Sequence, residues 1–64
     1  MIATLHGKIQ SRTDDSLVVN IGGIGFRVRV PSTTLANLGA VGSDVELFTH
    51  LRVREDELSL YGFA

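Results

Sequence analysis

The sequence predicts an all-β domain, a five-stranded barrel with one short helix between the third and fourth strands. Apolar and polar residues alternate with a period of two through most of the chain, as in strands with one buried face. Clusters of Gly, Asp and Ser separate these segments, and one segment, between the third and fourth strands, has the pattern of a short helix. The 64 residues have room for a single domain.

The first two strands are predicted from this alternation. Residues 1–10 have one apolar and one mostly polar face, and Gly7 indicates a bulge or bend, as at a barrel corner. The polar segment 11–16 contains two adjacent aspartates and predicts a turn. A second strand follows at residues 17–21.

A hairpin connects the second strand to the third. Gly22-Gly23-Ile24-Gly25 supplies the positive φ angles that a tight hairpin turn needs. The third strand, residues 26–30, has Phe26 in its core pattern. Pro31 ends this strand because proline cannot donate to a β-ladder.

The helix is predicted at residues 33–38, with Ser32 as its N-cap. Leu35 and Leu38 are three residues apart and therefore share one face. Gly39 stands where a left-handed residue commonly ends a helix.

A second hairpin is predicted from residue 45 to the end of the chain. Its first strand, residues 45–53, directs alternate side chains up to Val53 toward one face, and its second runs over residues 57–61. Between them stands Arg54-Glu55-Asp56-Glu57, which contains no Gly, Pro or Asn. Three adjacent carboxylates repel one another, so this tip is interpreted as selected for charge.

This order of five strands and one helix is typical of an OB-fold, a partly open Greek-key barrel that often binds oligonucleotides. The alternative is an SH3-like barrel, which the pattern of apolar and polar residues alone does not distinguish well from an OB-fold. So small a domain buries only about 60% of its unfolded surface, so oligomerisation or attachment to a larger chain is expected to support it. The sequence contains no Cys, which excludes disulfides and thiolate metal sites and fits a cytoplasmic location. It also contains no apolar run long enough to span a membrane and no signal peptide.

Catalytic and metal-binding functions are disfavoured. No Ser-His-Asp set can be named, and His6 and His50 fall on the strand faces opposite the core. We expect no metal site and no cofactor, since neither His nor a further carboxylate is clearly placed to join the acidic tip. Among the aromatic residues, Phe48 falls outside the core pattern, and core or subunit contacts are favoured over base stacking. The apolar residues predicted on outward faces are candidates for a subunit interface: Ile2, Val18 and Phe48.

Several short motifs together carry a family resemblance. They are Met1-Ile2 with Leu5 and Gly7, Gly22-Gly23-Ile24-Gly25-Phe26, Pro31-Ser32-Thr33-Thr34, Phe48-Thr49-His50, Val53-Arg54-Glu55-Asp56 and Leu60-Tyr61-Gly62-Phe63. In order and spacing the chain resembles the N-terminal domain of the bacterial RuvA family, the Holliday-junction-binding subunits. The resemblance covers residues 1–64.

The resemblance implies a function that composition does not show. Members of the family are OB-folds that assemble as homotetramers, in some cases as a dimer of tetramers, and hold four-way junction DNA open in recombination and repair. It implies that Glu55 and Asp56 form an acidic pin at the junction centre. It implies that the chain is not itself an enzyme, because the motor is a separate ATPase, RuvB. The helix-hairpin-helix domain and the motor-binding domain of the family are expected to be absent from this chain.

Around the pin, basic residues are assigned to attraction of the DNA backbone: Arg54, Arg27, Arg29 and Lys8. The net charge of −1 means that charge distribution must matter more than total charge. Two other functions stay open at this point. One is a single-strand nucleic-acid-binding OB-fold module, and the other is a small metal-dependent nuclease that uses the acidic tip.

Overall fold

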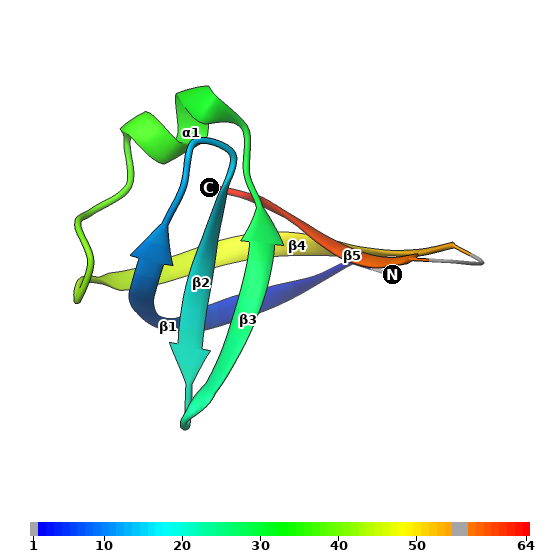
Figure 1. Ribbon diagram of the computed structural model, residues 1–64, viewed down its shortest axis with the longest axis horizontal. Helices are drawn as coiled ribbons and strands as arrows, with labels where there is room; N and C mark the ends of the chain where they lie inside the picture. The colour runs from blue at the N-terminus through cyan, green and yellow to red at the C-terminus, as the bar shows by residue number, and fades with distance from the viewer. Residues whose placement is uncertain (1, 55–56) are drawn as a thin grey trace.

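The computed structural model describes residues 2–54 and 57–64, with side chains described for residues 4–54 and 59–64. Its elements follow the order β1 (Ile2–Arg12), β2 (Ser16–Ile21), β3 (Ile24–Arg29), α1 (Ser32–Ala36), β4 (Asp44–Arg54) and β5 (Glu57–Phe63). The strands close into a barrel in the order β1-β2-β3-β5-β4 (Figure 1). This arrangement confirms the predicted five-stranded OB-fold.

The first strand pairs with two different strands of the closed barrel. Residues Ile2 to Lys8 pair with β4, and residues Lys8 to Arg12 pair with β2 across a register shift between Ile9 and Ser11. A Cβ on Gly7 would meet the backbone of Asn20 and two side chains of β2. Glycine therefore lets β1 pass close to β2 where the strand changes partners. This close approach explains the bend predicted at Gly7.

Barrel closure depends on β5. β3 and β5 run parallel and are paired only at Arg29 and Tyr61 among the described residues. Next to this contact, a Cβ on Gly62 would lie 2.6 Å from Cγ1 of Val28 and 3.3 Å from Cδ1 of Leu47. The absence of a side chain at Gly62 is thus what allows β5 to reach the core and close the barrel.

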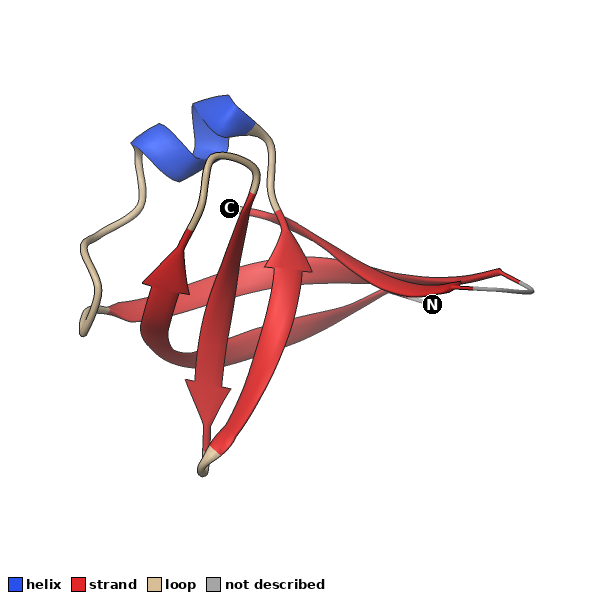
Figure 2. Cartoon of the chain, viewed as in Figure 1, coloured by secondary structure: helices blue, strands red, loops and turns tan. Residues whose placement is uncertain are grey.

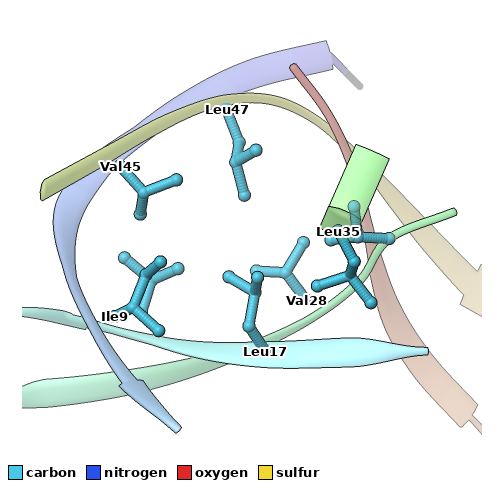
Figure 3. Packing of buried hydrophobic residues seen from close by; sticks show 8 residues of the cluster. Ile9, Leu17, Val28, Leu35, Val45 and Leu47 are labelled. Carbon is cyan, nitrogen blue, oxygen red and sulfur yellow. The ribbon is translucent and has the colours of Figure 1, made fainter. Parts of the chain in front are cut away.

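The core consists of aliphatic side chains from the four strands β1 to β4 and from the helix (Figure 3). Its buried members are Ile9, Leu17, Val19, Val28, Val30, Leu35, Val45 and Leu47. Leu35 and Leu38 both pack on it, as their spacing predicts. The helix covers one end of the barrel (Figure 2).

The ends of the helix differ from the prediction. The helix is shorter, Pro31 rather than Ser32 occupies the N-cap position, and no side chain caps it. Gly39 is also not among the residues with positive φ. Instead, the Arg12 guanidinium donates hydrogen bonds to the carbonyl oxygens of Leu35 (2.7 Å), Leu38 (3.4 Å) and Gly39 (2.6 Å). A cation from β1 therefore satisfies the C-terminal carbonyls and removes the need for a glycine cap.

Two predicted core-face residues are exposed because both hairpins extend beyond the barrel. Phe26 lies opposite buried Val19, on the core side as its pattern predicts, but its side chain is 36% exposed. Val53 is 70% exposed, since the β4–β5 hairpin projects past the core (Figure 1). The Gly22-Gly23 turn has φ values of 59° and 92°, as a tight hairpin requires, whereas Ile24 already belongs to β3.

Strand boundaries shift by one to a few residues. β1 continues to Arg12 and β5 continues to Phe63, past the predicted ends at residues 10 and 61. The turn between β1 and β2 is correspondingly shorter than predicted, and Thr13 stabilises it through hydrogen bonds to Asp15 and Ser16.

We expect Gly62→Ala to lower the free energy of unfolding by about 1–3 kcal/mol, because the added methyl group overpacks the core at Val28. Urea unfolding followed by circular dichroism measures the loss. Val28→Ala removes the opposing methyl groups, so the double variant should cost less than the sum of the two single variants. Additive costs would contradict the close approach of β5.

We expect Arg12→Met to lower the free energy of unfolding by about 1–3 kcal/mol, because three carbonyl oxygens lose a charged donor while the apolar stem is kept. The matched control is Arg27→Met, which removes an exposed cation from β3 and should change stability by less than about 0.5 kcal/mol. Equal effects in the two variants would show that the carbonyl contacts do not matter.

Candidate functional site

The β4–β5 hairpin carries the predicted acidic tip. The two strands pair in continuous antiparallel register from Phe48 opposite Phe63 to Arg54 opposite Glu57. The base of β4 is fixed in the barrel by buried side chains at Val45, Leu47 and Thr49, and burial ends beyond Leu51. The hairpin is therefore held at its base and exposed toward its tip.

The pin residues lie between the two described strands. Glu55 and Asp56 are outside the described residues, and so are the side chains of Glu57 and Leu58. The described part of the chain fixes the strands on either side, which end at Arg54 and begin at Glu57. The acidic pin consequently stays a prediction from sequence.

The outward side of the sheet formed by β1, β4 and β5 collects polar and aromatic side chains. We call it the outer face. On β4 it alternates with the buried positions, and on β5 it follows from the antiparallel register, because directly opposite residues point to the same side. Its described members on the hairpin are Phe48, His50, Arg52, Arg54, Ser59, Tyr61 and Phe63.

The predicted basic contacts differ in their availability. Lys8 forms an exposed ion pair with Asp44, with 3.2 Å between Nζ and Oδ1. Arg27, Arg29 and Arg54 are exposed, and their side chains make no hydrogen bond or ion pair within the described structure. The three arginines are thus free to meet phosphate, whereas Lys8 is partly neutralised.

Sequence reasoning missed Arg52. This residue is exposed on the outer face between His50 and Arg54, and it too has no partner among the described residues. The strand period would have found it, because positions 50, 52 and 54 must share a side. The outer face therefore carries a row of cationic and titratable groups that leads toward the tip.

The three candidate interface residues are placed differently. Phe48 is 57% exposed and lies directly opposite Phe63, which is 50% exposed. Val18 is half-buried, and the side chain of Ile2 is outside the described residues. Of the three candidates, Phe48 is consequently the best supported as an exposed apolar contact residue.

Metal-ligating side chains do not gather in the described part of the chain. No cluster of three or more His, Cys, Asp or Glu residues that could hold a metal is found there. His6 and His50 are exposed, as predicted. No helix of the described residues is long and apolar enough to cross a membrane. The arrangement offers charge, aromatic surface and a projecting hairpin, which are means of binding.

Comparison with known proteins gives a family and named relatives. The family model described as the RuvA N terminal domain matches residues 1–62. The Holliday junction branch migration complex subunit RuvA of Chloroflexus aggregans is 56% identical over 64 residues, which are all of this chain and 33% of that protein. Proteins of the same name from Dehalococcoides mccartyi and Chromobacterium violaceum are each 48% identical over 64 residues. The chain spans about a third of the length of these relatives.

Proposed function

The chain belongs to the RuvA N-terminal domain family, and from this we propose that it is the part of a Holliday junction branch migration complex that holds a four-way DNA junction open. The observation that carries the proposal is the match over residues 1–62, joined to the 56% identity with a relative named for that complex. The proposed setting is DNA recombination and repair in the bacterial cytoplasm.

We assign the centre of the junction to Glu55 and Asp56. The β4–β5 hairpin is fixed in the barrel at its base and flanks these carboxylates, which supports a role at a distance from the core. A carboxylate and a phosphate about 4 Å apart in water repel each other by about 1 kcal/mol, and salt weakens this further. The repulsion from one pin is therefore weak, and several copies around one axis are needed to keep DNA strands apart.

Arginines on the strands supply the opposing attraction. Arg54, Arg27 and Arg29 are assigned to phosphate contacts because they are exposed and unpaired within the described chain. Lys8 is assigned a smaller share, since Asp44 already holds it. Backbone contacts fix position without reading bases, which suits a protein through which every sequence must pass.

Assembly completes the proposed site. We propose a homotetramer, in some settings a dimer of tetramers, whose subunit contact includes Phe48 with Ile2 and Val18. The exposure of the Phe48 side chain supports a contact there. The motor is proposed to be the separate ATPase RuvB, bound through a part of the protein outside these 64 residues. Neither catalysis nor a cofactor is assigned to this chain.

Neutralising the pin tests its role. In the complete protein that contains this chain, Glu55→Gln with Asp56→Asn should preserve assembly and change the branch-migration rate. Loss of about 1 kcal/mol of repulsion corresponds to a change of about fivefold. The matched control, Asp14→Asn with Asp15→Asn, removes the same charge from the β1–β2 turn. An unchanged rate in the pin variant, with the junction still bound, counts against the pin.

Truncating the exposed ring tests the subunit contact. Phe48→Ser should shift the chain toward monomer in light scattering, because the apolar area at the contact is lost, while its unfolding free energy changes by less than about 1 kcal/mol. Ile24→Ser removes an equally exposed apolar residue from the far end of β3 and is the control. A tetramer that persists in the Phe48 variant would remove this residue from the interface.

A further inference from the structure

A hollow of about 380 Å³ opens on the outer face of the β4–β5 hairpin. It is lined by His50, Arg52, Tyr61 and Phe63. The strand register explains this set, because His50 lies directly opposite Tyr61 and the other two residues follow each of them at the next position on the same side. Two aromatic rings, one imidazole and one guanidinium therefore line the same hollow from two adjacent strands.

Charge distinguishes this hollow from two others on the described surface. A hollow at the end of β3 includes the carboxylate of Asp15 in its lining. Another, beside the Gly22-Gly23 turn, includes the Lys8–Asp44 ion pair, so its cation is already neutralised. The lining at Arg52 contains no carboxylate, and Arg52 has no partner within the described chain. Its charge complements an anion.

The aromatic rings indicate which anion fits. Phe63 is half-exposed, and Tyr61 and Phe63 also border the hollow that contains Arg29. The same pair of rings thus has a guanidinium on each side, Arg52 on β4 and Arg29 on β3. Flat rings beside cations are how proteins bind single-stranded nucleic acid, with bases stacked on the rings and the backbone held by charge.

We propose that this hollow binds an unpaired nucleotide of a DNA strand, with the base against Tyr61 and Phe63 and the phosphate on Arg52. A paired base is stacked within its duplex and offers no face to these rings, so the site selects unpaired DNA. Stacking tolerates every base, because each has a π-face. This inference goes beyond the proposed junction-holding function: it uses a different part of the hairpin from the pin and acts by attraction.

Fluorescence anisotropy with a labelled eight-residue oligodeoxythymidylate at low salt tests the site. Phe63→Ala should weaken binding by roughly 5- to 150-fold, the effect of removing one stacking ring, and Phe63→Tyr should retain binding. The control, Phe26→Ala, removes a partly exposed ring from β3 and should leave affinity unchanged. Circular dichroism establishes that each variant is folded.

The cation is tested by salt dependence. Arg52→Gln should weaken binding and reduce the slope of log K against log salt by about 0.7, as expected for the loss of one single-strand phosphate contact. Lys8→Gln removes the same charge from an ion-paired position and should change the slope less. Equal slopes in the two variants would indicate only general attraction and would overturn the site.

Two DNA junctions, one with unpaired thymidines at the crossover and one fully paired, distinguish a failure of this proposal from a failure of the proposed function. The complete protein should bind a junction with unpaired thymidines at the crossover more tightly than a fully paired one, and Phe63→Ala should abolish that difference while keeping paired-junction binding. Absence of any difference, or of oligonucleotide binding by the unaltered chain, overturns the nucleotide site alone. Loss of paired-junction binding in the unaltered protein overturns the proposed function. Assembly that hides Phe63, shown by a Phe63→Ala variant that becomes monomeric, also overturns the nucleotide site.

Discussion

A short parallel contact between β3 and β5 decides whether this chain is a barrel or an open sheet. The described strands meet there at Arg29 and Tyr61, and the approach is permitted because Gly62 has no side chain to collide with Val28. Barrel closure also positions the residues of the candidate functional site. It fixes the base of the β4–β5 hairpin, and it sets Tyr61 and Phe63 between arginines from two different strands.

Most of the architecture follows from local rules that the sequence displays openly. The period of two, the Gly22-Gly23 turn and the paired leucines predict the strands, the first hairpin and the helix face, and the structure confirms them. The predictions that failed concern how deeply individual side chains are buried. Alternation tells which side Phe26 and Val53 take, but not whether the barrel reaches that far along the strand.

The helix end shows a second limit. A glycine after a helix predicts a left-handed cap only if the last carbonyls lack another donor, and Arg12 supplies that donor from 23 or more residues away along the chain. Long-range contacts of this kind leave no local pattern. The acidic tip is the reverse case, since its identity comes from sequence and family, and the described residues establish only the strands that flank it.

Charge in this small domain is divided between folding and binding. The Arg12 side chain binds carbonyl oxygens at the helix end, and Lys8 is paired with Asp44. The side chains of the arginines on β3 and β4 make no hydrogen bond or ion pair within the described structure. A net charge of −1 is therefore compatible with exposed arginine side chains that have no partner in the described structure. We propose on this basis that the β4–β5 hairpin attracts a DNA backbone through its arginines and repels it at Glu55 and Asp56.

The distal hairpin contributes length without contributing core, because burial on β4 ends before Arg52. The exposed side chains of Arg52, Val53 and Arg54 are consequently less constrained by packing than those at the base of the strand. Evolution, or an engineer, can exchange the tip for one of another charge or reach while the barrel beneath it stays the same. The barrel thus acts as a fixed scaffold, and the hairpin tip is the part that can vary.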